Sequence, residues 1–390
     1  MKTISFISAK GGSGKTMITA TMADFLGKLG KRVLIIDADG STNGMTLFYL
    51  KEIRKYAASC EKCLGVLEDS FEVETANYTP LNGYVSLLPA TYKFVNTDSF
   101  NVNLFEQNLR KITAFYKQNK EGIVDYILID CQAGVDVRSE VVVKEAISDE
   151  VIIVSEYDPI SAAGIERLKG LFYKESMHDR SWVLLNKVWP EFANTSSDFL
   201  ETTRHLPPIT WNPEVVLAYA RRGLALDFER GNEYTLNMVK LLRVLLGKEI
   251  KKPLDEWLNG REEIIKKPIY DEYLKWRKEY DEIQKLEKAD LNPLLPILIV
   301  LVTVTVFFVL FSFQFGITNN IVFPTFIVFL AASIMYVSTS LYRRRKQMLK
   351  RNEFRKKMIS GRLEELEKLK HADIEKVLRI NRGDCPLSLN

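Results

Sequence analysis

The chain has 390 residues, of which 46% are hydrophobic and 27% are charged, a composition typical of folded proteins and sufficient for two or three domains. Its 20 glycines and 13 prolines show no repeat, which excludes collagen-like and low-complexity proteins. Four cysteines are too few to staple a secreted protein of this size. No short apolar leader precedes the first strand-like run, so we expect the bulk of the chain to be cytosolic and reduced.

Charge is distributed unevenly along the sequence. Residues 1–250 carry a net charge of −3, residues 251–292 carry −1, and residues 343–390 carry +8. The basic excess therefore lies near the end of the chain and not on its large first part. This distribution argues against DNA as a partner of residues 1–250, although it leaves a local basic patch open.

Short apolar, β-branched runs alternate with helical segments over residues 1–248. Near-continuous apolar runs with helices between them predict a parallel sheet that is covered on both faces. We therefore predict a doubly wound α/β domain over residues 1–248. Its candidate strands are Thr3–Ser8, Arg32–Ile36, Tyr84–Leu88, Tyr126–Ile129, Val151–Ser155 and Trp182–Leu185.

A glycine-rich loop follows the first predicted strand and opens the first predicted helix, Met17–Leu29. Its glycines let backbone N–H groups and the helix N-terminus point at a polyphosphate, while Lys15 is placed for the β- and γ-phosphates and Thr16 for Mg²⁺. Ala9 stands where the strict phosphate-loop pattern has glycine. The loop predicts a nucleoside triphosphate site built from Gly11, Gly12, Ser13, Gly14, Lys15 and Thr16.

Several motifs, in the same order along the chain, resemble those of the MinD/ParA family of ATPases. The segment Lys10–Thr16 resembles the deviant Walker A motif, whose extra early lysine matches Lys10. The resemblance covers roughly residues 1–230 and implies a P-loop ATPase fold, with ATP and Mg²⁺ as cofactors. The other matching segments are Asp37–Asn43 (switch I), Ile127–Gly134 (Walker B strand and switch II), Ser148–Val154 and Leu185–Lys187.

The resemblance also implies roles for the residues around the phosphates. Lys15 and Thr16 hold phosphate and Mg²⁺, Asp130 reaches the Mg²⁺ shell, and Asp37 supports that shell. Asp39 is the residue that orients or activates the attacking water. The alternative is that Asp39 only caps or braces a turn.

Two further residues are assigned by the same resemblance. Asn186 hydrogen-bonds adenine, and Lys10 reaches across a homodimer to the partner's nucleotide, where it neutralises charge as an arginine finger does. A solvated loop lysine is the plainer interpretation of Lys10. Lys10, Lys15 and Asp39 are thus the predicted catalytic residues.

Three positions depart from the family pattern. Met17 stands where the family usually has a second threonine, Gln132 where it has proline, and Ser41 where the ParA branch has glutamine. These departures bear on the rate of hydrolysis and on switching, whereas they leave the binding residues in place.

Residues 249–292 predict a helical connector. Ile269, Tyr273, Trp276, Tyr280 and Ile283 recur at spacings of 4, 3, 4 and 3, which places them on one stripe of a helix that starts after Pro268. Such a stripe packs on its own domain or forms a dimeric coiled coil.

Two apolar runs, Leu294–Phe313 and Ile321–Tyr342, follow the connector. Each is long enough to span about 30 Å as a helix, and together they predict a transmembrane hairpin within residues 293–342. Basic residues flank the hairpin on both sides, at Lys285 and Lys288 and from Arg343 onward, so both ends should face the cytoplasm. We therefore predict a multi-pass protein of a bacterial inner membrane, with the lipid bilayer as a partner.

The basic segment 343–390 completes the predicted organisation. Its Lys-, Glu- and Leu-rich part predicts a helical tail on the cytoplasmic side. This helix is solvated, or it contacts anionic lipid headgroups or the connector.

Cys60 and Cys63 have the spacing of metal ligands. No second Cys pair or His pair completes a tetrahedral zinc site in one chain. A dimer could share four thiolates.

Three functions follow from these features. The first is a membrane-anchored, ATP-dependent dimerisation switch that clusters or recruits an unidentified protein partner. The second is a tyrosine kinase of the same fold, although such kinases place their spans before the ATPase and end in a tyrosine cluster, whereas no tyrosine follows Tyr342 here. The third is a nucleotide-binding membrane scaffold with little turnover.

Overall fold

The computed structural model divides the chain into two compact units. One consists of Met1–Pro268 with Asp373–Asn390, and the other of Ile269–Ala372. The structure describes all residues except 61–62, 69–71, 74–77, 93–100, 119–123, 135–136, 173–178, 190–203, 290–301, 308, 311–321 and 380–390.

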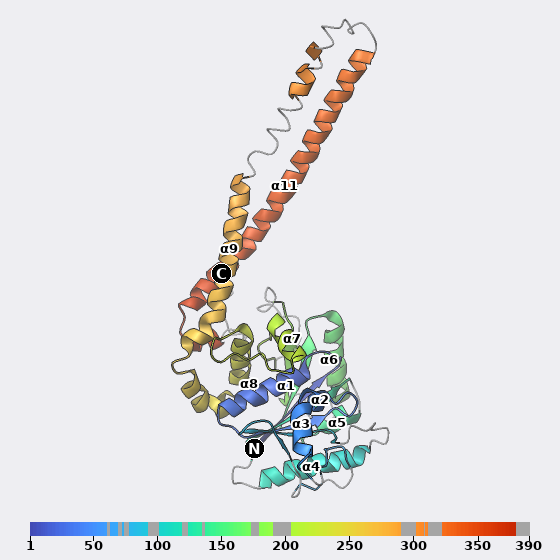
Figure 1. The fold of residues 1–390 in the computed structure, drawn as a ribbon, viewed down its shortest axis with the longest axis vertical. Helices are drawn as coiled ribbons and strands as arrows, with labels where there is room; N and C mark the ends of the chain where they lie inside the picture. Colours follow the sequence, from blue (N-terminus) through green and yellow to red (C-terminus); the bar gives the residue numbers. More distant parts are fainter. Residues whose placement is uncertain are drawn as a thin grey trace. The chain divides into compact units, whose positions relative to one another are not determined.

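The first unit is built around a seven-stranded sheet (Figure 1) with the order β3-β4-β2-β5-β1-β6-β7. All neighbouring strands are parallel except β3 and β4, which are antiparallel. The six predicted strands are confirmed, and the short β3 is additional. The strands are β1 Lys2–Ser8, β2 Val33–Ala38, β3 Thr79–Pro80, β4 Val85–Leu88, β5 Tyr126–Ala133, β6 Glu150–Glu156 and β7 Ser181–Asn186.

Helices cover both faces of this sheet, as its apolar strands require. All six residues of β2 are buried, which is the pattern of a strand covered on both sides. Helices α1 and α8 lie over one face and α4 lies over the other (Figure 1). The helices of this unit are α1 Lys15–Lys28, α2 Gly44–Phe48, α3 Leu50–Ala57, α4 Val102–Gln118, α5 Val137–Val142, α6 Pro159–Phe172, α7 Pro213–Ala220, α8 Glu233–Leu258 and α12 Ile374–Arg379.

Each face has its own apolar contacts. Residues of α4, α5 and α6, such as Leu109, Val142 and Ile165, form one buried cluster with the strands. On the side of α1, the ring of Phe25 lies 5.0 Å from that of Trp257 in α8. The Tyr234 hydroxyl of α8 is 3.1 Å from the Thr21 hydroxyl of α1. The observed fold is thus a parallel α/β fold with a helical C-terminal region.

Helix α9, Glu262–Ala289, begins before Pro268 and not after it as predicted. A proline inside a helix removes the N–H group that would bond to the carbonyl four residues earlier, here that of Ile264. Gly231 lies against this carbonyl with φ +74°, and a Cβ at Gly231 would be 2.1 Å from the Ile264 oxygen. Only glycine fits this close approach, so the helix continues through Pro268 beside a glycine of the same unit.

The second unit pairs α9 with α11, Val322–Lys370. The Arg362 guanidinium donates to both carboxylate oxygens of Glu272, at 2.8 and 3.0 Å, and Arg355 donates to Glu279 at 2.8 Å. These pairs are seven residues apart on each helix and run in opposite directions, which is the register of an antiparallel helical pair. The predicted stripe therefore packs on the C-terminal helix of its own chain, and Trp276 of the stripe is buried.

The described residues do not support the predicted transmembrane hairpin, because no helix among them combines the length and the apolar character that crossing a bilayer requires. Of the run Ile321–Tyr342, residues 322–342 belong to α11, which continues unbroken into the charged residues 343–370. Most of the run Leu294–Phe313 lies outside the described residues. This finding overturns the predicted multi-pass location in the inner membrane and leaves the bilayer partner unsupported.

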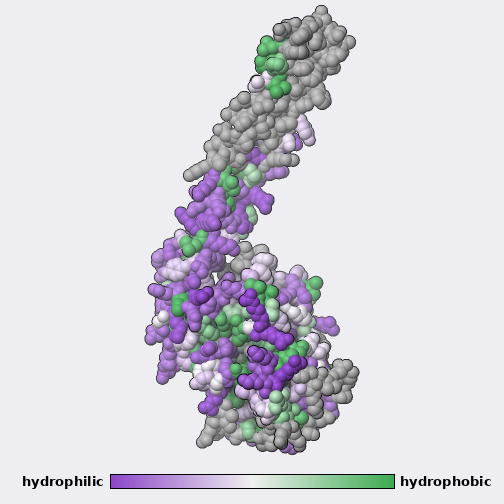
Figure 2. Space-filling view, viewed as in Figure 1, coloured by the Kyte–Doolittle hydropathy of each residue, from purple (hydrophilic) through white to green (hydrophobic). Residues whose placement is uncertain are grey.

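The described surface of α9 and of the second half of α11 is mostly hydrophilic (Figure 2). The apolar contacts of the pair lie between its helices, where Ile359, Leu363 and Leu366 are buried. A narrow apolar seam, formed by these three side chains and flanked by ion pairs, therefore holds the two helices together.

Substitution of this seam should open the helical pair. We expect Ile359→Ala, at a side chain that is 1% exposed, to cost about 2 to 5 kcal/mol. The neighbouring Met358→Ala, at a side chain that is 43% exposed, should cost about 0.5 kcal/mol or less. Hydrogen exchange of the full chain, read by mass spectrometry in peptides from α9 and α11, measures both. Equal protection in the two variants would contradict this packing.

Candidate functional site

The glycine-rich loop connects β1 to α1 at the carboxyl edge of the sheet. Gly12 and Gly14 have φ of +80° and +93°, a region that favours glycine. A Cβ at Gly14 would also lie 2.3 Å from the Asn186 amide nitrogen. The local sequence therefore suits the tight turn that brings the loop to the N-terminus of α1, where backbone N–H groups favour an anion.

A cavity of about 680 Å³ opens at this loop, a size typical of small-molecule sites. Residues of the loop and of both predicted switch segments line it. Its lining also includes the apolar side chains of Trp211, Val215, Val216 and Tyr219. No sequence pattern indicated these four residues, because they lie outside every recognised motif. Phosphate-binding residues and apolar side chains thus line one cavity.

Lys15 and Thr16 lie where the loop becomes α1. The Lys15 ammonium is buried and donates to the Ser8 hydroxyl at 2.8 Å. The Thr16 hydroxyl donates to one carboxylate oxygen of Asp130 at 2.7 Å. The other oxygen of Asp130 is buried and has no hydrogen-bond partner among the described residues. A hydroxyl and a carboxylate with one unused oxygen fit the oxygen ligands that Mg²⁺ takes beside phosphates.

Strand register places Asp37 beside Asp130. The two residues are direct partners on the neighbouring strands β2 and β5. Asp37 accepts hydrogen bonds from the Thr46 amide at 2.7 Å, the Thr46 hydroxyl at 2.6 Å and the Asp39 amide at 3.0 Å. Thr46 was missed by the sequence analysis, since nothing local marks it as a partner of Asp37.

Burial shifts the ionisation of both carboxyl groups. Burial, and after it the nearby charge of Asp130, raise the pKa of Asp37 to about 8, against the lowering effect of its hydrogen bonds with Thr46 and Asp39. Burial also raises the pKa of Asp130 to about 6, against the opposing effect of Lys15. A cation in this part of the site would favour the carboxylate forms of both groups.

Asp39 braces its own turn in this structure. One of its carboxylate oxygens accepts from the amides of Ser41 at 3.0 Å and Thr42 at 2.9 Å, and the other accepts from the Thr42 hydroxyl. Gly44 follows closely, and a Cβ there would lie 3.1 Å from the Thr16 hydroxyl. The Asp39 turn thus lies beside Thr16, at the rim of the phosphate end of the cavity.

Asn186 and Lys187 support the glycine-rich loop from β7. The Asn186 amide donates to the Ser13 carbonyl at 2.7 Å, and the Lys187 ammonium donates to the Gly12 carbonyl at 2.6 Å. Lys187 has φ +58°, which is unusual for a residue other than glycine. These contacts occupy two carbonyl oxygens of the loop and hold its backbone in place.

The Lys10 side chain lies beside two acidic residues, Glu156 and Asp158. Its side chain is 51% exposed, and its ammonium lies 3.1 Å from a Glu156 oxygen and 4.0 Å from an Asp158 oxygen. The glutamate raises the pKa of Lys10 through its hydrogen bond and its charge. The described residues that line the cavity include Lys15 and not Lys10. The structure therefore separates the two predicted lysines.

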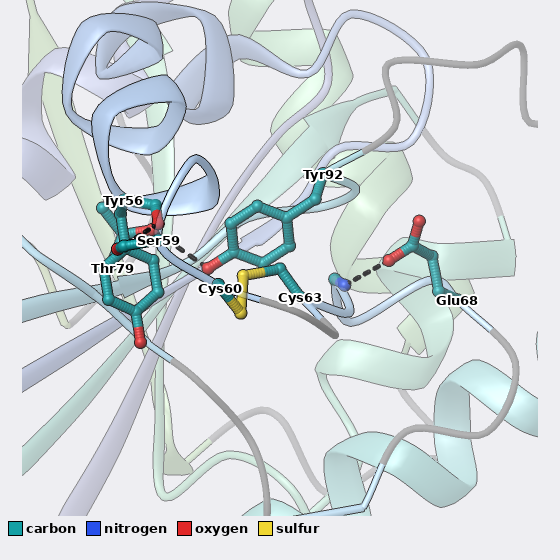
Figure 3. Close-up of a disulfide and its surroundings, with 8 residues drawn as sticks. Tyr56, Ser59, Cys60, Cys63, Glu68, Thr79 and Tyr92 are labelled. Carbon is teal, nitrogen blue, oxygen red and sulfur yellow. Dashed lines mark hydrogen bonds between the residues drawn. A yellow bond between two sulfur atoms is a disulfide. The ribbon is translucent and has the colours of Figure 1, made fainter.

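Cys60 and Cys63 form a disulfide beside Tyr92 (Figure 3). Their Cα atoms lie 5.9 Å apart. These two cysteines are therefore oxidised in the structure, whereas the sequence analysis predicts reduced cysteines. Cys131 is a buried thiol beside Asp130 in the chain.

Comparison with known proteins gives matches over the part of the chain that holds this site. Residues 1–178, fewer than half of the chain, match the family model of an AAA domain. An uncharacterised ATP-binding protein of Methanocaldococcus jannaschii is 24% identical over 70% of this chain and 96% of its own length. The septum site-determining protein MinD of Synechocystis is 31% identical over 48% of this chain. The match spans 64% of that MinD, less than two thirds of its length.

Solved structures share the fold. A plasmid partition protein of Borrelia burgdorferi bound to AMPPNP has a TM-score of 0.52 at 19% identity, over 63% of this chain and 99% of its own. MinD of Pyrococcus horikoshii complexed with Mg-ADP has a TM-score of 0.50 at 19% identity, over 65% and 98%. At these identities the likeness concerns the fold.

The raised pKa of Asp130 predicts a pH dependence of stability. A carboxyl group whose pKa is raised on folding contributes stability that is full below its unfolded pKa and is lost as the pH rises through about 6. Without nucleotide, this group should make the protein about 1 kcal/mol less stable at pH 7 than at pH 5. We expect Asp130→Asn to remove that difference. Denaturant unfolding of both proteins at the two pH values measures it, and parallel pH profiles would contradict it.

Proposed function

We propose that the protein is a P-loop ATPase of the MinD/ParA type and acts as an ATP-dependent dimerisation switch that recruits or clusters a protein partner. One observation carries the proposal. The phosphate-binding residues Lys15 and Thr16 lie inside the cavity, while Lys10 of the same loop lies outside it, half exposed. A lysine in that place is available to a second subunit.

The cofactors are ATP and Mg²⁺. Lys15 at the N-terminus of α1 binds the β- and γ-phosphates, and Thr16 with Asp130 holds Mg²⁺, with Asp37 behind them. The bound ion neutralises charge on the β- and γ-phosphates. The buried, unpaired oxygen of Asp130 supports this assignment.

Hydrolysis is the proposed reaction, giving ADP and phosphate. Asp39 takes the role of orienting the attacking water, for which its side chain must leave the contacts with Ser41 and Thr42. Asn186 pairs with adenine through its carbonyl oxygen, because its amide nitrogen already donates to Ser13. Charge in the transition state is spread over the phosphate oxygens, so positioning and cations supply most of the catalysis.

The surface beside the cavity supports dimerisation. Helix α7 has no buried residue, and its apolar side chains Val216, Leu217 and Tyr219 are more than half exposed. Val216 and Tyr219 also line the cavity. A second subunit seated over the nucleotide would cover these side chains and remove apolar surface from water.

Nucleotide binding is tested at Lys15. We expect Lys15→Ala to weaken MgATP binding by about 10- to 100-fold, because it removes a charged hydrogen bond to phosphate. The exposed Lys51→Ala is the matched control and should bind as the unmodified protein does. Isothermal titration calorimetry with MgATP and MgADP measures both. Unchanged affinity in Lys15→Ala would contradict the proposed site.

Dimerisation is tested at Lys10. We expect Lys10→Ala to bind MgATP within about threefold of the unmodified protein, while turnover falls by about 10³-fold, as when an arginine finger is removed. ATP should dimerise the unmodified protein and Lys51→Ala, but not Lys10→Ala. Sedimentation velocity with ATP or ADP, together with phosphate release, measures these effects. A dimer that ignores both the nucleotide and Lys10 would refute the switch, and phosphate transfer to tyrosine would favour a kinase.

A further inference from the structure

Glu156 lies between two lysines at the end of β6. One carboxylate oxygen is 3.1 Å from the Lys10 ammonium, and the other is 2.7 Å from the Lys187 ammonium. The glutamate side chain is 22% exposed, whereas the two lysines are 51% and 43% exposed. One carboxylate therefore neutralises two cations that come from different parts of the chain.

The two lysines differ in what else holds them. Lys187 also donates to the Gly12 carbonyl at 2.6 Å, so it stays fixed on the glycine-rich loop. The further neighbour of Lys10 is Asp158, whose closest oxygen is 4.0 Å away. If Lys10 leaves, Lys187 still neutralises Glu156, and Asp158 keeps its hydrogen bonds from the Ile160 and Ser161 amides. The arrangement thus allows Lys10 to be released at little cost.

We propose that Glu156 is a clasp that holds Lys10 on its own subunit and releases it only when a second subunit brings bound nucleotide. The inference rests on the proposed dimerisation switch and adds its regulation. Glu156 is a positioning residue, since it acts through Lys10 and is not among the described residues that line the cavity. Its effect is to raise the protein concentration at which dimers form.

The strength of the clasp suits this task. Ion pairs between partly exposed side chains are weak, and salt weakens them further. Such a pair biases Lys10 without locking it. The triphosphate of a partner subunit carries more negative charge than one carboxylate and competes for the same ammonium.

The nucleotide-free protein gives a direct test. Deprotonated amines react with acylating reagents, so an ion pair that raises the pKa of Lys10 slows its modification. We expect Glu156→Gln to speed acetylation of Lys10 several-fold, measured by mass spectrometry relative to Lys51 of the same molecule. Glu145→Gln, at an exposed glutamate, is the control and should change nothing. Unchanged acetylation of Lys10 in Glu156→Gln would overturn the clasp whether or not the protein dimerises.

The dimer gives the second test. At saturating ATP, Glu156→Gln should lower the concentration for half-maximal dimerisation about 3- to 10-fold, and this gain should shrink in 0.5 M NaCl. Lys187→Met should instead raise this concentration, because Lys10 then no longer shares Glu156 with Lys187. If the unmodified protein dimerises with ATP and Glu156→Gln has the same threshold, the clasp is refuted and the switch stands. A different result would be that neither the unmodified protein nor any variant dimerises with ATP, although Glu156→Gln still speeds acetylation of Lys10. That result would refute the dimerisation switch, and with it the role of Glu156 in controlling dimerisation.

Discussion

Two carboxyl groups buried side by side constrain this site more than any other feature. Asp37, near the end of β2, and Asp130, within β5, are register partners, so the sheet itself holds them together. Burial disfavours their charged forms, and a cation between the strands and the phosphates relieves that cost. Lys15 and the Thr16 hydroxyl already approach from α1. The acidic pair therefore explains why the glycine-rich loop, the helix N-terminus and a divalent ion belong to one site.

The sequence predicted what depends on local patterns. Apolar runs identified six of the seven strands, and the two-residue β3 was missed because so short an antiparallel strand has no periodicity to detect. The loop residues from Lys10 to Thr16 were identified by their order and spacing. Thr46 and Glu156 were not, since neither belongs to a recognised motif and each acts through another residue, Asp37 or Lys10. Asp39 shows a further limit, because the same residue type suits a turn and a catalytic role, and here it braces a turn.

Helices α9 and α11 show what hydrophobic periodicity can and cannot predict. The stripe from Ile269 to Ile283 predicted a buried face, and in the structure α11 packs on α9. Arg362 and Arg355 of α11 donate hydrogen bonds to Glu272 and Glu279 of α9. Spacing shows which side of a helix is apolar but not which segment covers it. The hydropathy of residues 293–342 led to the membrane prediction that the described helices do not support. Pairing of α9 with α11 gives the charged tail a structural role that composition alone did not single out.

The glycine-rich loop and the Asp39 turn are held in different ways, and this difference bears on switching. Asn186 and Lys187 tie the carbonyls of Ser13 and Gly12 to β7, so the phosphate-binding backbone is fixed from outside. The Asp39 carboxylate bonds within its own turn, while the Asp39 backbone amide donates to Asp37 of β2 at 3.0 Å, so the backbone of the turn is tied to the sheet. Lys10 belongs to the fixed loop, yet its ammonium is held by a half-exposed ion pair. A γ-phosphate would therefore move the Asp39 and Lys10 side chains, while the backbone that binds the nucleotide stays in place.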